Sequence, residues 1–322
     1  MTPIFPMSAK QTYFYAPTIK FQPLFLKPKY WGTWLMLSFL WLVIWLPRKW
    51  TMKIGAFVGD QMRRRNSKRR HIVEVNIRLC FPNLSEIQRQ QMVKDHFRCY
   101  GRGLVDMGLA MMGSVRRVEK YSDVVGFENL KALPKTQKIV LITYHTTTLD
   151  MGWRLVLADI DLVSMMKRDK NPVLNWFLYR SRTRYKKVLV LMRDQGLRGI
   201  IKGMNNGKLC YFIPDEDFGD GKHAVFAPFF GQQRSTLNII SRLAKITDAV
   251  VIPSICRLMP ETGRYRTTIG PPLENFPAGN YVADATNMHQ AMEKLILDAP
   301  EQYMWTFRWF RTQPDEKPDF YK

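Results

Sequence analysis

Cysteine and acidic residues are both scarce in this sequence of 322 residues. The four cysteines, Cys80, Cys99, Cys210 and Cys256, form no CxxC pair, so neither a zinc site nor a disulfide framework is indicated. Only 27 aspartates and glutamates stand against 49 lysines and arginines, which leaves a formal net charge of +22. A surplus of this size predicts an anionic partner, which would be nucleic acid, anionic lipid or an acidic protein.

The sequence also lacks an apolar run of full membrane-spanning length. The uncharged stretch at residues 31–47, WGTWLMLSFLWLVIWLP, stops at its proline slightly short of the roughly 20 residues that cross a bilayer. Three interpretations stay open for it: a short or tilted transmembrane anchor, a monotopic, hairpin-like insertion, and a buried core helix. A signal peptide is not indicated, because the preceding arm is long and no small-residue cleavage site follows.

A dense basic cluster follows this apolar stretch. It consists of Arg63, Arg64, Arg65, Lys68, Arg69 and Arg70. Cations beside an apolar segment are attracted to anionic head groups and mark the cytoplasmic side of a membrane, although an isolated charged run is more often a solvated surface. We therefore expect an N-terminal arm (1–30), a membrane anchor region (31–60) and a catalytic domain (61–322) on the cytoplasmic face.

From residue 138 onward, apolar runs alternate with helical patterns. The runs are KIVLIT, IDLVSMM, KVLVLM, KLCYFI, AVFAPF and AVVIPSI, and the helical stretches lie near residues 150–158, 197–204, 236–245 and 287–297. Ser85 and Gln88 form a possible capping box before a further helical stretch, residues 86–112. Such alternation predicts an α/β fold with a central sheet layered with helices, preceded here by the membrane-anchoring helix.

One histidine lies where this fold class places its sites. The strand KIVLIT ends near Tyr144, so His145 follows at its carboxyl end, and Asp150 falls in the first turn of the next helix. If His145 lies in the loop, its ring can turn back so that one nitrogen meets the Asp150 carboxylate and the other acts as a general base. An ordinary hydrogen-bonding histidine in a turn is the alternative. No serine lies in a GxSxG motif and no cysteine has an evident partner, so direct attack by an activated hydroxyl is the simplest chemistry.

A series of blocks resembles those of a known family. HTTTLD, residues 145–150, resembles the H-x4-D/E block of the glycerolipid and lipid A acyltransferases. The other blocks run in family order over almost the whole chain: PKYWGTWL (28–35), NIRLCFPNLSEIQRQQMV (76–93), KNPVLNWF (170–177), RSRTRY (180–185), IPDEDFG (213–219), VFAPFFG (225–231) and PEQYMW (300–305). Together they resemble the late lipid A acyltransferases of Gram-negative bacteria, the lauroyl and myristoyl transferases.

The resemblance implies a glycerolipid-acyltransferase-like fold and an enzyme that uses acyl carrier protein as its acyl donor. The acceptor would be a hydroxyl on a lipid A precursor of the Kdo2-lipid IVA type, without a covalent enzyme intermediate. It further implies a location at the cytoplasmic face of the bacterial inner membrane, acyl carrier protein and membrane as partners, and no cofactor, metal or nucleic acid. It leaves open the acyl chain length and the position that is acylated.

Site residues follow from the same blocks. His145 and Asp150 match the base and its partner. Substrate contacts are implied for Arg182, Arg184, Lys167, Phe229, Phe230 and Gly231. Relatives usually have arginine at the position of Lys167, and lysine offers a phosphate a point charge instead of a bidentate contact. Asp215 and Asp217 could be a metal-binding pair, but we interpret them as parts of a turn, because no further carboxylates cluster nearby.

Two other functions compete with this one. A membrane-tethered protein that binds anions without chemistry explains the charge but not the HTTTLD block at a strand end. A glycerophospholipid acyltransferase shares the His–Asp block, but relatives of that kind usually carry PEGT-like residues where this chain has VFAPFFG.

Overall fold

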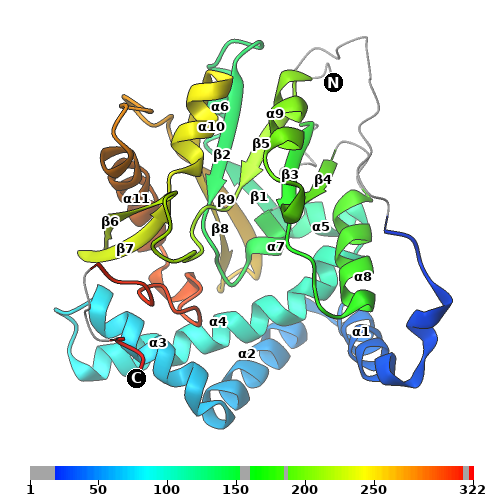
Figure 1. The fold of residues 1–322 in the computed structure, drawn as a ribbon. Coiled ribbons are helices and arrows are strands. Elements are labelled where there is room, and N and C mark those ends of the chain that lie inside the picture. The colour runs from blue at the N-terminus through cyan, green and yellow to red at the C-terminus, as the bar shows by residue number, and fades with distance from the viewer. Residues whose placement is uncertain (1–18, 153–159, 185–187, 315–318) are drawn as a thin grey trace.

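The computed structural model describes residues 19–152, 160–184, 188–314 and 319–322, which form a mixed α/β body (Figure 1). Its centre is a seven-stranded sheet, with the strands in the order β1 Ser122–Val125, β9 Arg264–Ile269, β8 Ala249–Met259, β2 Lys138–Thr143, β5 Leu209–Phe212, β3 Leu162–Met166 and β4 Val188–Met192. A separate antiparallel hairpin is made of β6 Ala224–Phe229 and β7 Gln232–Leu237. The α/β class predicted from the sequence is confirmed.

Helices surround this sheet and form a layer at the base of the molecule (Figure 1). The α-helices are α1 Trp31–Val43, α2 Arg48–Arg65, α3 Ser67–Cys80, α4 Glu86–Met112, α5 Val115–Tyr121, α6 Glu128–Lys131, α7 Leu149–Gly152, α8 Pro172–Thr183, α9 Arg198–Asn205, α10 Ile239–Thr247 and α11 Tyr281–Leu297. Short 3-10 helices are η1 Pro23–Leu26, η2 Pro28–Tyr30, η4 Arg193–Gln195 and η5 Pro300–Gln302. The predicted capping box is present at the start of α4, where Ser85 and Gln88 cap each other's backbone N–H groups.

The sheet is buried on both faces, as strands with continuous apolar runs require. Along β2, Val140 and Ile142 face a core shared with α9, α10 and α11, while Ile139 and Leu141 face a second core shared with α6 and α8. Strands β8, β2, β5, β3 and β4 are mutually parallel, and only β9 and β1 run the opposite way. The carboxyl ends of the five parallel strands therefore lie along one edge, which faces the helical layer (Figure 1).

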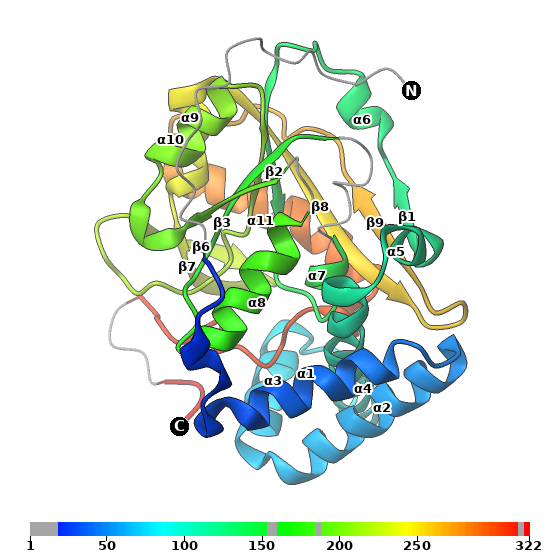
Figure 2. The ribbon, with the colours of Figure 1, turned by 90° about the vertical axis from the view of Figure 1, so that its right-hand side faces the viewer.

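The helical layer packs tightly because glycines line its main contact. A Cβ atom on Gly59 of α2 would lie 2.0 Å from the Phe97 carbonyl oxygen, and one on Gly101 of α4 would lie 2.2 Å from the Gly55 carbonyl oxygen. Only glycine permits α2 and α4 to approach so closely. Both α1 and α2 run along the base of the molecule (Figure 2).

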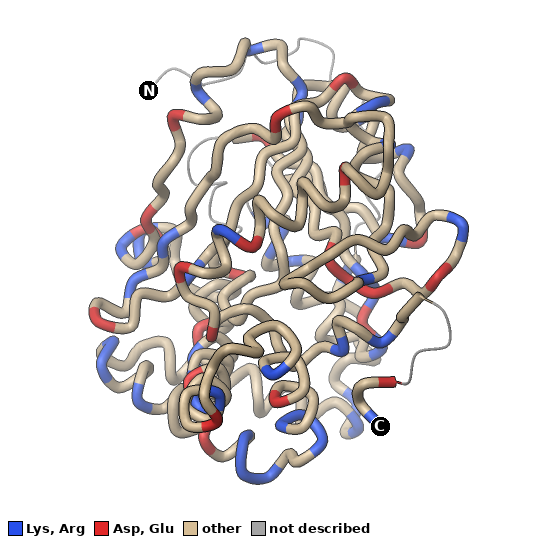
Figure 3. The backbone as a smooth tube through the Cα atoms, turned by 90° about the vertical axis from the view of Figure 1, so that its left-hand side faces the viewer, with Lys and Arg blue, Asp and Glu red and all other residues tan. Residues whose placement is uncertain are grey.

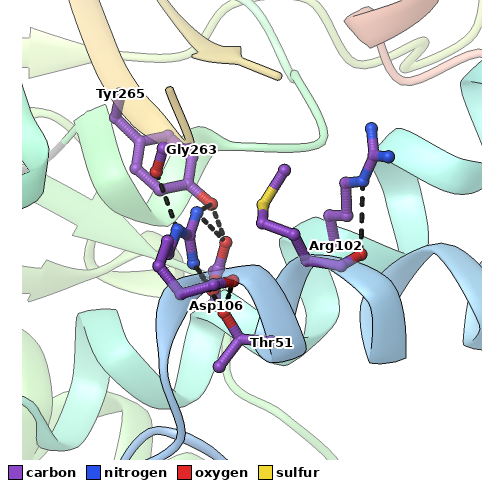
Figure 4. Close-up of polar contacts among 7 residues, drawn as sticks. Thr51, Arg102, Asp106, Gly263 and Tyr265 are labelled. Carbon is purple, nitrogen blue, oxygen red and sulfur yellow. Dashed lines mark hydrogen bonds and ion pairs between the residues drawn. The ribbon is translucent and has the colours of Figure 1, made fainter. Parts of the chain in front are cut away.

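A buried network ties this layer to the sheet (Figure 4). Both terminal nitrogens of Arg48, at the start of α2, reach both carboxylate oxygens of Asp106 on α4, at 2.5 and 2.8 Å. The Nε of Arg48 donates to the Gly263 carbonyl oxygen at 2.7 Å, and the Tyr265 hydroxyl on β9 donates to Asp106. This network joins three elements that are far apart in the sequence.

The segment predicted as an anchor is helical but short. Helix α1 has 13 residues, which gives a length of about 20 Å against about 30 Å of bilayer hydrocarbon. Among the described residues, no helix combines the length and the apolar character needed to cross a membrane. The buried-core interpretation does not fit either, because Leu35, Leu42 and Trp45 are 71%, 60% and 63% exposed. An anchoring role for this segment stays a prediction.

The basic cluster lies at the junction of α2 and α3, near the base of the molecule (Figure 3). Arg64, Arg65, Lys68 and Arg69 are exposed, and the Arg69 guanidinium also donates to the Thr306 carbonyl oxygen at 2.7 Å. The expected division at residue 60 falls inside α2, which packs along α4 of the domain assigned to residues 61–322. The first described helices and the sheet thus share one packed body.

Candidate active site

His145 lies two residues beyond β2, at the edge where the parallel strands end. Strand β2 pairs in parallel with β5, and Ile142 is the register partner of Phe212. His145 and Asp215 each follow this pair by three positions, so the sheet brings the two residues together although 70 positions separate them in the chain. The expectation of a histidine at the carboxyl end of a central strand is confirmed.

The contact between these two residues is short and double. His145 Nδ1 lies 2.5 Å from Asp215 Oδ1, and the His145 backbone N–H donates to Asp215 Oδ2 at 2.7 Å. The Asp215 side chain is fully buried, whereas that of His145 is 16% exposed. With Nδ1 occupied by Asp215, the nitrogen that remains is Nε2, which has no hydrogen-bond partner among the described residues.

The charges of the pair support each other. Burial would raise the pKa of Asp215, but the His145 ring and the nearby Arg234 guanidinium outweigh burial and hold this pKa below its usual range. Burial would lower the pKa of His145, but the Asp215 carboxylate outweighs it and the pKa of His145 is raised. Asp215 therefore stays ionised and makes the imidazole a stronger base, which is the arrangement that a general base requires.

The carboxylate at His145 Nδ1 belongs to Asp215 and not to Asp150. The expected pairing of His145 with Asp150 is therefore wrong. Helix α7 places Asp150 in its first turn, where its Oδ1 accepts a hydrogen bond from Arg182 Nη2 on α8 at 3.2 Å. The turn interpretation also fails for Asp215, which is the partner of His145. It holds for Asp217, which accepts from the Gly219 backbone and from the backbone and hydroxyl of Thr312.

Two cavities meet beside the histidine. The larger, of about 620 Å³, has an apolar interior formed in part by Met166, Leu178 and Phe212, and a basic rim that includes Lys167. The smaller, of about 230 Å³, lies against α4 and includes Leu104 and Met107. His145, Leu149 and Arg182 line both cavities. Two reactants held in separate spaces could thus meet at His145.

The rim of the larger cavity is cationic in balance. It carries Lys167, Arg168, Lys170, Arg182 and Arg193 against Asp169 and Glu216. Arg193 pairs with Glu216 at 2.8 Å and Arg168 with Asp194 at 2.9 Å, so part of this charge is already matched. Lys167 and Arg182, two of the expected substrate contacts, line this cavity. The surplus of positive charge favours an anionic reactant.

The chain is similar to proteins of one known family. A family model described as bacterial lipid A biosynthesis acyltransferase matches residues 18–312. The chain belongs to this family. The lipid A biosynthesis lauroyltransferase of Escherichia coli (strain K12) is 33% identical over 304 residues, covering 94% of this chain and 98% of that protein. The palmitoleoyltransferase of the same organism is 32% identical over 307 residues, covering 95% and 99%. Its myristoyltransferase is 26% identical over 310 residues, covering 94% and 95%.

Membership in this family makes the protein an acyltransferase of lipid A biosynthesis. The family that the sequence blocks resemble is therefore confirmed. The relatives include lauroyl, palmitoleoyl and myristoyl transferases at comparable coverage. The names do not fix the chain that this acyltransferase transfers.

Several residues expected in the site lie outside both cavities. Phe229 is fully buried in the core against Tyr144 and Tyr303. Phe230 and Gly231 form the tip of the β6–β7 hairpin, and their φ angles of 47° and 75° are those of a two-residue hairpin turn. These three residues are explained by packing and turn geometry, and their positions do not support the expectation that they line the site.

Arg184 is also placed elsewhere. Its Nη2 donates to the Ala110 carbonyl oxygen near the end of α4 at 3.2 Å, and it lines neither cavity at His145. In the acyltransferase this contact links the end of α8 to the helical layer. The expected substrate contact of Arg184 is not supported by its position.

The sequence did not identify Asp215 as the partner of His145. It also did not identify Arg234 and Tyr303, which lie behind this pair. The Tyr303 hydroxyl donates to Asp215 Oδ2 at 3.2 Å, and Arg234 donates to the Asp215 carbonyl oxygen. The available signal was positional, because Asp215 follows the run KLCYFI just as His145 follows KIVLIT. Parallel strands bring such positions to the same edge of a sheet.

Proposed function

We propose that the protein transfers a fatty acyl chain from acyl carrier protein to a hydroxyl of a lipid A precursor of the Kdo2-lipid IVA type. His145 acts as the general base, and no covalent enzyme intermediate forms. The observation that carries this proposal is the His145–Asp215 pair, with Nε2 left open at the junction of two cavities.

In this reaction, His145 Nε2 takes the proton from the acceptor hydroxyl as its oxygen attacks the thioester carbonyl carbon. The resulting tetrahedral species collapses, the C–S bond breaks, and the new oxygen ester forms. The proton on Nε2 passes to the departing thiolate of the carrier. Asp215 stabilises the transient imidazolium, and its bond to Nδ1 keeps the proton-accepting nitrogen directed outward.

Arg182 lies at the centre of this arrangement. It lines both cavities, and its Nη2 lies 3.2 Å from Asp150 Oδ1, which orients the guanidinium. A guanidinium in this place can bind a substrate phosphate or stabilise the negative charge that develops on the thioester oxygen. The role of Asp150 in this proposal is to hold Arg182, instead of holding His145.

The charge of the protein suits its proposed reactants. A lipid A precursor carries phosphates, and acyl carrier protein is acidic. The basic rim at Lys167 and Lys170 offers both a favourable surface. The larger cavity also offers apolar side chains, including Met165 and Leu197, against which an acyl chain can lie.

We further propose that the base of the molecule rests on the cytoplasmic face of the inner membrane. Trp31 on α1, Trp50 and Phe57 on α2, and Trp45 in the turn between them are between 57% and 63% exposed. Aromatic side chains next to cations such as those of residues 63–70 suit the lipid–water interface. Such a face supports association without a spanning helix.

The test is a transfer assay with purified protein, labelled acyl carrier protein and the tetra-acylated lipid A precursor in detergent micelles. We expect mass spectrometry to show one added acyl group on the precursor, and none with the His145→Ala variant. Glycerol 3-phosphate serves as the competing acceptor. Transfer to glycerol 3-phosphate and none to the precursor would make the protein a glycerophospholipid acyltransferase and reject the proposal.

A further inference from the structure

Asp215 is held by three residues, of which His145 lines the cavities and Tyr303 and Arg234 lie behind them. His145 binds both carboxylate oxygens, through Nδ1 at 2.5 Å and through its backbone N–H at 2.7 Å. The Tyr303 hydroxyl adds a bond to Oδ2 at 3.2 Å. Arg234 Nη2 donates to the Asp215 carbonyl oxygen, and its Nη1 donates to the Tyr303 hydroxyl oxygen at 3.1 Å.

These bonds give the Tyr303 hydroxyl one direction. A guanidinium can only donate hydrogen bonds, so the Tyr303 oxygen must accept from Arg234. Its single hydrogen is then left for Asp215 Oδ2. Arg234 thereby turns a group that could either donate or accept into a dedicated donor to the carboxylate.

Arg234 occupies an unusual place for a charged residue. It is only 1% exposed, and its guanidinium carbon lies 4.5 Å from the Trp309 ring centroid and 4.8 Å from that of Phe229. Burying a guanidinium costs free energy unless bonds and nearby opposite charge offset the loss of water. The neighbouring Asp215 supplies that charge, yet Arg234 bonds its backbone carbonyl oxygen, and the carboxylate oxygens are bound by His145 and Tyr303.

The backbone holds Tyr303 in place independently of its hydroxyl. Thr147 N–H donates to the Gln302 carbonyl oxygen at 2.8 Å, and Met304 N–H donates to the His145 carbonyl oxygen at 2.9 Å. The Tyr303 ring also stacks on Trp309, with centroids 5.1 Å apart. This gives the block PEQYMW a place in the site, because it runs directly alongside the His145 loop.

We propose that Tyr303 and Arg234 are positioning residues for the His145–Asp215 pair. Arg234 directs the Tyr303 hydroxyl, and Tyr303 holds the Asp215 carboxylate in the orientation in which it meets the His145 ring. The inference rests on the proposed role of His145 as general base. It assigns a function to two buried residues that touch neither cavity.

The pKa of His145 also depends on the charges and hydrogen bonds around Asp215. Asp215 and Glu216 raise the pKa of His145, and the Arg234 charge opposes them. The Tyr303 hydroxyl shares the Asp215 carboxylate with the His145 ring. Burial and the Arg234 charge lower the pKa of the buried His289. Loss of the hydroxyl leaves the carboxylate a stronger partner for His145. The acid limb of the rate profile should then move to higher pH.

Tyr303→Phe is the variant of choice, because it removes one oxygen and keeps the stacked ring. We expect kcat to fall about tenfold with KM nearly unchanged, the usual scale for losing one hydrogen bond to a charged group. Tyr321→Phe is the matched control. Tyr321 is a buried tyrosine whose hydroxyl bonds Asn76 and the Phe310 backbone instead of Asp215.

A double-mutant cycle with Asp215→Ala decides whether Tyr303 acts through the carboxylate. We expect Tyr303→Phe to lower kcat in the native background, shift its acid limb to higher pH, and have little further effect when Asp215 is alanine. An equal loss in both backgrounds, no loss in the native one, or the same loss from Tyr321→Phe would overturn the inference. His145→Ala in the same assay separates the two proposals, because full activity of that variant rejects the general base itself.

Discussion

Two buried networks in this protein are built from the same residue types and do different things. Arg48, Asp106 and Tyr265 join the helical layer to the sheet (Figure 4). Arg234, Asp215 and Tyr303 lie behind His145, the proposed general base. In each, an arginine, an aspartate and a tyrosine are mutually bonded in the interior.

The difference lies in what the arginine does to the carboxylate. Arg48 uses both terminal nitrogens on both oxygens of Asp106, which satisfies the acid within the network. Arg234 instead bonds the backbone of Asp215 and the Tyr303 hydroxyl, so the carboxylate can still bind His145. The Asp106 carboxylate, paired directly with Arg48, joins structural elements. The Asp215 carboxylate is not bonded by Arg234 and can therefore bind His145.

The largest expected effect is on the catalytic side. His145→Ala should lower kcat by about 10² to 10⁴, the usual range for loss of a general base. The fold should persist, because the ring is partly exposed and lies at the end of β2. Single-turnover acyl transfer, together with circular dichroism, checks both statements. Near-normal turnover would reject the mechanism.

A change in the Arg48–Asp106–Tyr265 network should affect stability instead of kcat. Arg48→Met leaves Asp106 buried without its ionic partner, and breaking a buried pair typically costs about 3 to 5 kcal/mol. We expect urea unfolding to show a loss of this order, with kcat per folded molecule close to that of the native protein. A large fall in kcat at native stability would show that the two networks are not separate in function.

Arg182 lies between these extremes, because it is paired with Asp150 and also lines both cavities. Arg182→Ala should cost about 2 to 4 kcal/mol in kcat/KM. A loss mainly in KM indicates a phosphate contact, and a loss mainly in kcat indicates charge stabilisation in the transition state. Arg182→Lys should rescue poorly if the contact is bidentate. A mild effect that fades with salt would make Arg182 a surface charge.

The pH dependence of rate and of stability should run in opposite directions. The pKa of His145 is raised above its ordinary value of 6.5. The neutral base therefore forms, and kcat/KM rises, as the pH passes through this raised pKa. The stability that the protonated histidine gains from Asp215 is present in full below pH 6.5 and is lost as pH rises through the raised pKa. Rate profiles and thermal unfolding between pH 5 and 9, compared with Asp215→Asn, measure both. An acid limb below the ordinary histidine value would contradict the pairing.

The smallest effects are expected at the membrane surface. Arg64→Gln, Arg65→Gln or Lys68→Gln should each cost about 1 kcal/mol of binding to anionic vesicles, and the loss should shrink at high salt. Arg69→Gln should differ, since the Arg69 side chain bonds the Thr306 carbonyl oxygen and its loss affects packing as well. Vesicle flotation at two salt concentrations separates the two kinds of change. Equal, salt-independent losses at all four positions would argue against an electrostatic contact.

Local sequence signals predicted much of the fold. The continuous apolar runs marked β2, β3, β4, β5 and β8, and the capping box marked the start of α4. The order of the strands was not predictable in this way, because an apolar run says that a strand is buried but not which strands lie beside it. Asp215 was misread for this reason, since its pairing with His145 depends on β2 and β5 being neighbours.

The differences between the expected and the observed site residues have related causes. Phe229 and Gly231 lie in a block that resembles the family, but a block holds packing and turn residues as well as contacts to substrate. Arg234 gave no signal in the sequence, because arginines are expected at the surface, whereas this one is buried against Phe229 of the paired strand β6 and against Trp309 of a distant segment. Spacing along the chain favoured Asp150, five positions from His145, over an aspartate 70 positions away.

The most direct test of the two networks is kcat per folded molecule for Asp215→Asn measured beside Asp106→Asn. The account predicts that Asp215→Asn lowers kcat about 100-fold or more, the scale of impaired general-base catalysis, while Asp106→Asn lowers stability and leaves kcat within about threefold. Native kcat in Asp215→Asn, or an equal loss of kcat in both variants, would contradict it.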